Sequence, residues 1–462
     1  MKRFSYILLL LSVACTYFKN PSAPQAPTWS PVFDAAAIGG SDLVASRAVG
    51  EFYKRNGYQF VWLDSGGIRQ AADSMVSIIR SADSYGLLPE DYHVAEINKL
   101  MTLPRDAQQA VALELYLTDS FFALCYHLRH GRIERKSLSR RVLSDHLDGA
   151  DLVALQRVLA GSLLSDVLGS YEPRYPAYHT LKSTLKQMLA RRTSDTLWLW
   201  QTGQLAVNME RWRWYTPGLP ARYISVNVPS FTMQVIDQDS VVVKSKVIIG
   251  KPETPTPELE SVVRSFIIYP YWHVPRSILK EILPHIQQDT LYLKQHNYDV
   301  LDARGRPMKT SSIDWLAHTA DDFPYTLRQR EGSENTMGII KFVFNNRYGV
   351  YLHDTNARGL FSKTDRALSH GCIRVQKAVE LARYLIRNDH IVSPEDLDQY
   401  LMLQHRMEIK LIEPIPVYLQ YFTCTENDGK VTFHNDLYGK DKAMMIALYG
   451  DKKEVRSHPP SL

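Results

Sequence analysis

The stretch with the clearest chemical potential runs from Tyr351 to Val375 and contains a cysteine and a histidine. Cys372 ends the sequence S-H-G-C at 369–372, and His353 lies upstream of it. A thiol reacts as a nucleophile in its thiolate form, and an imidazole within hydrogen-bond reach is the usual means of producing that form near neutral pH. We therefore interpret Cys372 as a candidate nucleophile and His353 as its general base.

The residues that follow Cys372 predict a helix. Apolar side chains recur there at helical spacing, at Ala378, Ala382 and Leu385. The first N–H groups of a helix are unpaired and its dipole favours negative charge, so a position just before a helix stabilises a thiolate. Such donors also bind an oxyanion. We expect the N–H groups of Gly371 and Cys372, with the Tyr351 hydroxyl, to be the oxyanion donors, and Gly371 to adopt a positive φ.

Several motifs resemble those of a known family. The pattern from His353 through S-H-G-C at 369–372 to Arg374 is similar to the active-site motif of the L,D-transpeptidases, which have a YkuD-type catalytic domain. The similarity extends to the large YcbB-type subgroup through residues 351–355, 270–278 and 208–214. The resemblance implies a periplasmic, cysteine-dependent acyltransferase of peptidoglycan biosynthesis. Such an enzyme forms 3–3 cross-links between stem peptides, contributes to cell shape and is a target of carbapenems.

The resemblance also implies roles for the neighbours of the candidate nucleophile. In the family a backbone carbonyl just after the histidine orients the ring, and here that is the carbonyl of Asp354. A role for the Asp354 carboxylate as third member of a triad stays open. His370 either braces the turn or lines the leaving-group side. Ser369, in the same turn, and Tyr351 are assigned to substrate binding.

Two more residues are candidates for substrate binding. Arg374 can hold a substrate carboxylate through two parallel hydrogen bonds, or it can fix its own strand through backbone carbonyls, and both interpretations are open. The resemblance places Trp272 in the lining of the substrate pocket. A tryptophan in a Pro-rich turn is also expected in a packed core.

Other chemistries stay open at the level of the sequence. Zinc coordination by His353, His370 and Cys372 is the main rival, but no fourth ligand is suitably spaced, so we expect neither a metal nor another cofactor. With water as acceptor the enzyme would be an L,D-carboxypeptidase, and with a protein lysine it would attach proteins to peptidoglycan. The alternative from another class is a non-catalytic, cell-wall-binding lipoprotein that has kept the fold.

The N-terminus has the features of a secretion signal. Basic residues precede an apolar run from Phe4 to Val13, which is too short to span a bilayer. We assign residues 1–15 to a signal peptide and expect an exported, periplasmic protein. Cys15 is a candidate for lipidation and hence for membrane anchoring, and ordinary cleavage by signal peptidase is the alternative.

The bulk composition limits the partners. The length of 462 residues exceeds one ordinary core and predicts roughly two to three domains. The net charge of +5 is spread along the chain without a Lys/Arg-rich run, which argues against nucleic-acid binding. Four cysteines are too few for a disulfide framework, and whether Cys125 pairs with Cys424 is open. The sequence gives no indication of oligomeric state.

Periodicity divides the chain into an α+β arrangement. Residues 16–40 form a Pro-rich tether, and helical periodicity predicts a scaffold domain at 41–205. Alternating apolar residues predict a β-rich catalytic domain at 206–411, with a capping insertion at about 284–337 that acts as a substrate lid. Residues 412–462 are expected to dock on this body. The small peptidoglycan-binding domain usual in YcbB-type enzymes does not fit between the two domains.

Overall fold

The computed structural model describes residues 43–65, 67–102, 106–141, 143, 148–191, 193, 195–216, 218–388 and 390–450. The predicted signal peptide and tether, with Cys15, lie outside the described residues. The chain divides into two compact units, one made of residues up to 80, 89–125 and 143–170, the other of residues 81–88, 126–142 and 171 onwards. Within the described ranges, no helix is long and apolar enough to cross a membrane.

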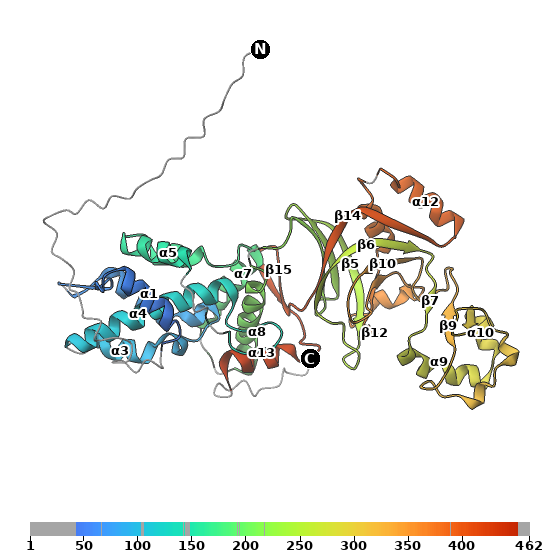
Figure 1. The fold of residues 1–462 in the computed structure, drawn as a ribbon, viewed down its shortest axis with the longest axis horizontal. Coiled ribbons are helices and arrows are strands. Elements are labelled where there is room, and N and C mark those ends of the chain that lie inside the picture. The colour runs from blue at the N-terminus through green and yellow to red at the C-terminus, as the bar shows by residue number, and fades with distance from the viewer. Residues whose placement is uncertain are drawn as a thin grey trace, which may run out of the picture. The chain divides into compact units, whose positions relative to one another are not determined.

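The first unit is helical, which confirms the prediction from its periodicity (Figure 1). Each amphipathic helix buries an apolar stripe, as α1 does with Val49, Phe52 and Tyr53. The elements in this part of the chain are α1 (Ser46–Arg55), β1 (Leu63–Asp64), β2 (Gly67–Ile68), α2 (Gln70–Arg80), η3 (Ala82–Tyr85, in the second unit), η4 (Pro89–Tyr92), α3 (Val94–Thr102), α4 (Ala107–His130, of which 107–125 belong to the first unit), α5 (Gly149–Leu159) and α6 (Leu164–Gly169).

Two buried carboxylates on α4 fix the irregular segments of this unit. Asp119 accepts hydrogen bonds from the Ala45 N–H at 2.7 Å and from His93 Nε2 at 2.8 Å. Glu114 accepts from the Trp62 N–H at 3.0 Å, and burial raises its pKa to about 7. Both side chains are fully buried, so their backbone partners are held in place by groups that have no access to water. Their role is structural.

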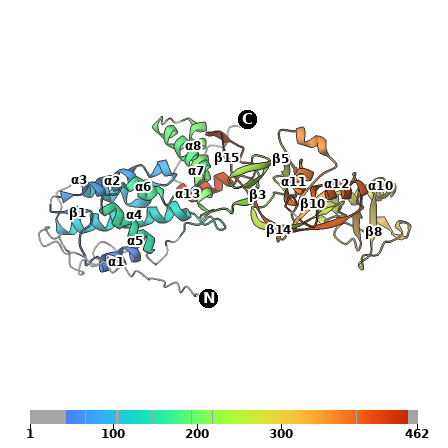
Figure 2. The ribbon, with the colours of Figure 1, turned by 90° about the horizontal axis from the view of Figure 1, so that it is seen from above.

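The second unit is built on a nine-stranded sheet, confirming the predicted β-rich domain (Figures 1 and 2). The strand β5 pairs with β13 at one end and with β4 at the other, so the pairings form a closed circuit around one apolar core. The strands in spatial order are β12 (Ala367–Ser369), β5 (Ser240–Gly250), β13 (Ile373–Val375), β11 (Leu352–His353), β10 (Ile340–Phe344), β6 (Leu259–Ile268), β14 (Met407–Gln420), β3 (Arg222–Asn227) and β4 (Thr232–Asp237).

The C-terminal segment supplies an interior strand of this sheet. The boundary expected at residue 411 falls within β14, which pairs in parallel with β3 and antiparallel with β6. Outside the inserted layer described below, this unit also contains the hairpin β15 (Cys424–Asn427) and β16 (Lys430–Phe433) and the helices α7 (Pro176–Ala190), α8 (Thr196–Arg213), η7 (Arg358–Ser362), α11 (Ala378–Leu385), α12 (Pro394–Leu403) and α13 (Lys440–Tyr449).

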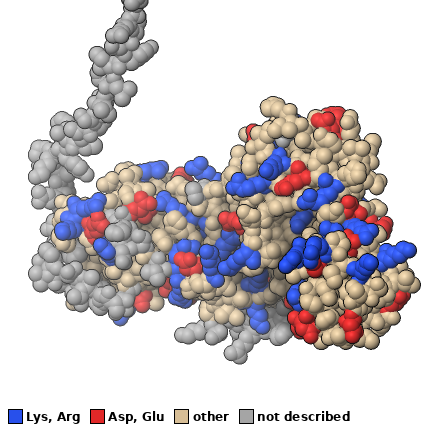
Figure 3. All heavy atoms as spheres, turned by 45° about the vertical axis from the view of Figure 1, so that its right-hand side comes forward, with Lys and Arg blue, Asp and Glu red and all other residues tan. Residues whose placement is uncertain are grey.

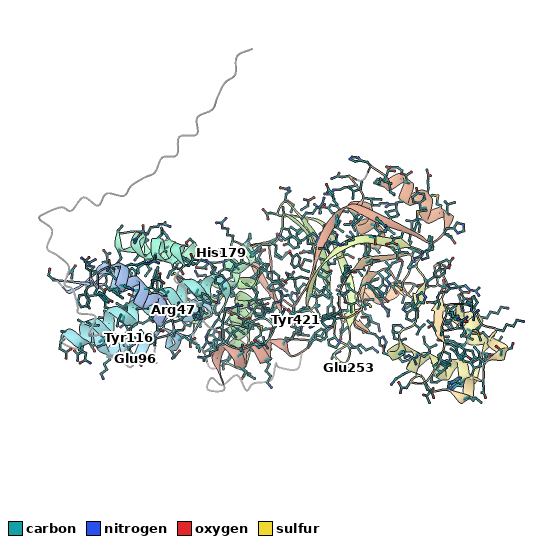
Figure 4. The ribbon with its side chains drawn as sticks, viewed as in Figure 1. Arg47, Glu96, Tyr116, His179, Glu253 and Tyr421 are labelled. Atoms are coloured by element: carbon teal, nitrogen blue, oxygen red, sulfur yellow. The ribbon has the colours of Figure 1, made fainter. Side chains whose placement is uncertain are left out.

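A buried ion pair connects α8 to the C-terminal helix. The Arg211 guanidinium lies 2.6 Å from the Asp441 carboxylate, and both side chains are almost completely buried. Thr423 donates a second hydrogen bond to Asp441 at 2.6 Å. The Arg211 guanidinium also lies over the ring of Tyr421, which is labelled in Figure 4. These contacts explain why the segment 208–214, rich in charge, lies inside the protein.

The predicted insertion forms a small layer with its own core. It begins earlier than expected, at Trp272, and Pro284 lies within a helix rather than at a boundary. Figures 1 and 2 show this layer as a group beyond the nine-stranded sheet. It contains the three-stranded sheet β7 (Trp272–His273), β9 (Thr326–Gln329) and β8 (Tyr298–Leu301), the helices α9 (Arg276–Gln288) and α10 (Leu291–Gln295), and the short turns η5 (Thr310–Ser312) and η6 (Trp315–Ala317).

The surface carries mixed charge. On the face shown in Figure 3, Lys and Arg are interspersed with Asp and Glu. A face of this kind has no extended field of one sign, which agrees with the spread of charge along the sequence.

We predict that Asp441→Asn destabilises the second unit because it leaves the Arg211 guanidinium buried without a counter-charge. The free energy of unfolding should fall by about 3 kcal/mol, measured by urea denaturation followed by tryptophan fluorescence. Asp398→Asn is the control, because its pair with Arg383 is exposed and should contribute no more than about 1 kcal/mol. Equal effects of the two substitutions would show that the buried pair does not hold the C-terminal helix in place.

Candidate active site

The S-H-G-C segment forms a tight turn between β12 and β13. Gly371 has a φ of +109°, which confirms the predicted positive φ and explains the need for glycine. The Ser369 hydroxyl accepts a hydrogen bond from the Gly371 N–H at 3.1 Å and donates one to the Cys372 carbonyl at 2.6 Å. Ser369 therefore braces the turn that presents Cys372.

A second brace comes from the Pro-rich loop after β5, which also carries Glu253, labelled in Figure 4. Thr256 Oγ1 donates to the Gly371 carbonyl at 2.9 Å and accepts from the Gly250 N–H at 2.9 Å. A Cβ at Gly250 would lie 2.1 Å from the Thr254 carbonyl oxygen and 3.0 Å from the Gly371 Cα. Sequence analysis did not identify this support.

The predicted position of Cys372 before a helix is wrong. The strand β13 follows Cys372 directly, and α11 begins only at Ala378. The Gly371 N–H is occupied by Ser369, whereas the Cys372 N–H has no acceptor among the described residues. A helix dipole thus contributes nothing at the thiol, and the Cys372 N–H is the free backbone donor at this position.

The parallel pairing of β11 with β13 brings the candidate residues together. Leu352 is opposite Ile373, and His353 is opposite Arg374. Leu352 and Ile373 are fully buried in the core of the sheet. Because side chains alternate along a strand, the flanking residues point to the other face. Tyr351 and His353 on one strand therefore share a face with Cys372 and Arg374 on the next.

A lysine on the adjacent strand belongs to the same face. Lys341 on β10 is the cross-strand partner of His353, so His353 lies between Lys341 and Arg374. The Lys341 ammonium is 3.9 Å from the centroid of the Tyr351 ring. Sequence analysis missed Lys341, because only the register of β10 against β11 places it there.

His353 is neutral at physiological pH. Its side chain is 4% exposed, and burial, followed by the positive charges of Arg374 and Lys341, lowers its pKa to about 3. The backbone carbonyls of Asp354 and Met337 oppose this effect. The ring is thus in the form that can accept a proton, while its protonated form is disfavoured by the two cations.

The Cys372 thiol is mainly protonated in the resting structure. Burial raises its pKa, and hydrogen bonds from the Tyr351 backbone N–H and hydroxyl, together with Lys341 and Arg374, partly offset that effect. The described structure contains no hydrogen bond between the His353 ring and the Cys372 sulfur. The two side chains occupy diagonal positions of neighbouring strands, a separation that aromatic and long side chains can span. Catalytic hydrogen bonds often tighten only when substrate binds.

Tyr351 and Trp272 form a chain of contacts towards the sulfur. Burial raises the pKa of the Tyr351 hydroxyl, and Cys372 and the Trp272 side chain lie near enough to influence it further. Trp272 is almost fully buried and belongs to the core of the inserted layer. Trp272 therefore packs in a core and reaches the site through Tyr351.

The Asp354 carboxylate is engaged away from the histidine. Oδ1 accepts from Arg358 at 2.7 Å, and Oδ2 accepts from the Ile339 N–H at 3.0 Å. Gly338 has a φ of +61°, and a Cβ there would lie 2.4 Å from Asp354 Oδ2. These contacts occupy the carboxylate with the adjoining loop, and no hydrogen bond joins the His353 ring to Asp354 among the described residues.

The remaining two candidate residues, His370 and Arg374, differ in their contacts. His370 Nε2 lies 2.8 Å from a carboxylate oxygen of Glu281 on α9, so it connects the turn to the inserted layer. The Arg374 guanidinium makes no hydrogen bond to any described residue, and the interpretation in which it fixes backbone carbonyls therefore has no contact to support it.

Among the described residues, Cys125, Cys424 and the cavity beside Cys424 do not form a comparable site. Cys125 and Cys424 are both buried and both free of disulfide bonds. A cavity of about 560 Å³ is lined by Tyr223, Asn227 and the hairpin β15–β16; it contains Cys424, whose pKa burial raises well above its usual range. In the part of the chain that the structure describes, no group of three or more His, Cys, Asp or Glu has the geometry to hold a metal ion.

Comparison with known families assigns both parts of the chain. Residues 221–392 match the L,D-transpeptidase catalytic domain of the YkuD family, and residues 47–185 match the Scaffold domain. The protein therefore consists of an N-terminal scaffold domain and a YkuD-type L,D-transpeptidase catalytic domain, and the turn that carries Cys372 lies within the latter.

A curated relative matches most of this chain. A protein of Haemophilus influenzae named "Putative L,D-transpeptidase" is 26% identical over 417 residues, which cover 89% of this chain and 81% of that protein.

Solved L,D-transpeptidases are more distant. The Ldtfm–avibactam carbamoyl enzyme is 13% identical and covers 44% of this chain, with a TM-score of 0.21, and an L,D-transpeptidase from Mycobacterium smegmatis is 16% identical and covers 43%, with a TM-score of 0.19. This chain spans 51% and 58% of their respective lengths. The domain assignment therefore depends on the family matches.

We predict that Tyr351→Phe raises the pKa of the Cys372 thiol, because it removes a hydrogen bond that stabilises the thiolate. The pH midpoint of Cys372 alkylation by iodoacetamide should move upwards by about one unit. Tyr348→Phe, in an exposed ring, is the control and should leave the midpoint unchanged. An unchanged midpoint in Tyr351→Phe would show that the hydroxyl does not support the sulfur.

Proposed function

We propose that the protein is an L,D-transpeptidase that forms 3–3 cross-links between peptidoglycan stem peptides through a thioester on Cys372. The observation that supports this most directly is the register of β11 and β13, which aligns Tyr351 and His353 with Cys372 and Arg374 on one face. The catalytic-domain match includes all four residues. The identity of the substrate, with meso-diaminopimelate as the L-centre donor and D-Ala as leaving group, follows from the family.

The first half-reaction is acylation of the cysteine. The thiol proton passes to the neutral His353 imidazole as the sulfur attacks the carbonyl carbon of the L-centre residue, and a C–S bond forms. The resulting oxyanion is stabilised by the unpaired Cys372 N–H. The Tyr351 hydroxyl can donate a second hydrogen bond to it once the sulfur is bonded to the acyl carbon. The C–N bond then breaks, and His353 returns the proton to the departing amine of the terminal D-amino acid.

The second half-reaction transfers the acyl group. An acceptor amine attacks the thioester carbonyl and loses a proton to His353. The C–S bond breaks, and the sulfur recovers its proton. The flanking cations Lys341 and Arg374 disfavour a lasting imidazolium, so His353 holds each proton only briefly. The two steps use the same base and regenerate the resting site.

The proposed function also implies that the protein is located outside the cytoplasm. An enzyme that acts on peptidoglycan must be exported, and the predicted signal peptide at 1–15 provides the route. Anchoring through a lipidated Cys15 would keep the catalytic domain near the cell wall. Globomycin treatment of cells that produce the protein tests this point, since unprocessed precursor accumulates only if Cys15 is lipidated.

We predict that Cys372→Ala abolishes covalent modification by a carbapenem, measured as the mass gain of the intact protein. His353→Ala should reduce the rate of modification by at least about 100-fold, because the thiol then lacks a general base. Cys125→Ala and Cys424→Ala are the matched controls and should be modified like the wild type. Loss of the adduct in either control would mean that the reactive thiol has been misassigned.

Muropeptide profiling of cells with and without the protein identifies the acceptor. We expect 3–3 dimers to decrease when the gene is deleted and to return with the wild type but not with Cys372→Ala. A change confined to stem-peptide trimming would indicate an L,D-carboxypeptidase, and a change confined to bound protein would indicate protein attachment. An unchanged profile together with no adduct would favour a binding protein without catalysis.

A further inference from the structure

The face that carries Cys372 contains cations without protein counter-charges. Lys341 and Arg374 are partly buried, and no described carboxylate pairs with either of them. Arg406 is also without an acidic partner in the described ranges and lies near Lys341. A partly buried cation without a counter-charge is costly, because it loses hydration without gaining an ion pair.

Other shielded cations of the same unit are paired. Arg211 binds Asp441, Arg213 binds Glu210, and Arg328 binds Asp299, all at 2.6 to 2.9 Å. The unpaired state is therefore not a general property of this unit. Arg366 is also shielded and has no ion pair among the described residues, but its guanidinium donates to backbone carbonyls, whereas Lys341 and Arg374 have neither kind of partner there.

The Cys372 sulfur does not supply a counter-charge for Lys341 and Arg374 in the resting state. Burial raises the pKa of the Cys372 thiol, so the sulfur is neutral for most of the time near pH 7. The two carboxylates named at this site, Asp354 and Glu281, are bound to Arg358 and His370 respectively. An anion that neutralises Lys341 and Arg374 must therefore come from a ligand.

We propose that Lys341 and Arg374 form a carboxylate-binding subsite on the sheet face beside Cys372, which selects donor peptides whose L-centre residue carries a free side-chain carboxylate. The inference rests on the proposed function, and Lys341 is its new element. The strands β10 and β13 flank β11, so their backbones are about 10 Å apart, a span that two long side chains bridge around one carboxylate.

The chemistry of the two side chains suits this task. Arg374 offers a planar fork that binds a carboxylate through two parallel hydrogen bonds, and Lys341 adds a point charge from the opposite side. The Tyr351 ring lies under the Lys341 ammonium at 3.9 Å and fixes its direction. A bound carboxylate would also neutralise the two charges that disfavour protonation of His353, and it would thereby strengthen the base during the reaction.

The test compares two synthetic donor tetrapeptides that differ in one group. In one the side-chain carboxylate of the L-centre residue is free, and in the other it is amidated. The rate of Cys372 acylation, measured by intact mass, should favour the free acid by about ten-fold or more in the wild type. Lys341→Gln should remove most of this preference, mainly through a higher KM for the free acid, so that the two peptides are acylated at similar rates.

Two further variants separate the subsite from other roles of the lysine. Lys341→Arg should restore most of the preference because it restores the charge. Lys410→Gln, which removes an exposed lysine of β14, should behave like the wild type. If Lys341→Gln slows acylation by both peptides equally and also slows alkylation by iodoacetamide, Lys341 supports the thiolate only, and the subsite proposal is wrong.

A binding measurement keeps the inference separate from the proposed function. In calorimetric titrations of Cys372→Ala, the free-acid peptide should bind about ten-fold more tightly than the amidated peptide, and the added Lys341→Gln change should remove the difference. If neither peptide acylates the wild type while this preference is seen, the proposed reaction fails and the subsite stands. Equal binding of the two peptides overturns the subsite.

Discussion

The contact on which the candidate site depends is the short parallel pairing of β11 with β13. Its register puts Leu352 and Ile373 into the core. Because side chains alternate along a strand, Tyr351, His353 and Cys372 then lie on the opposite face. A shift of one residue would exchange the two faces and bury the thiol in the core. The apolar pair thus fixes the chemistry more firmly than any hydrogen bond between the reacting groups.

The sequence predicts those parts of the site that depend on neighbouring residues in the chain, and it predicts poorly those that depend on which strands pair and in what register. The S-H-G-C motif identified Cys372, and the positive φ of Gly371 followed from its place in the turn. The strand at Ile373–Val375 was overlooked, because three residues show no clear period beside the helical pattern that begins at Ala378. Lys341 could not be found at all, since nothing in a single sequence states which residue of β10 lies opposite His353.

The fold shows the same division. The helical scaffold and the β-rich catalytic domain follow from periodicity, and so do the strand-like residues near the C-terminus. The inserted layer was placed too late in the chain because Pro284 resembles a boundary, although it lies inside α9. The helix α8 has no single apolar face, and its charges are buried through partners such as Asp441 that are distant in sequence. When a buried charge is neutralised by a residue far away in the sequence, the local sequence gives no sign that the charge is buried.

The position of β14 in the sheet constrains how the chain assembles. Residues 407–420 fill the gap between β3 and β6, which are both synthesised long before them. Until that strand arrives, two sheet edges remain open to solvent and can pair wrongly with other chains. Closure of the circuit of strands therefore waits for nearly the whole polypeptide, and a nascent chain that already contains Cys372 is still without a finished catalytic domain.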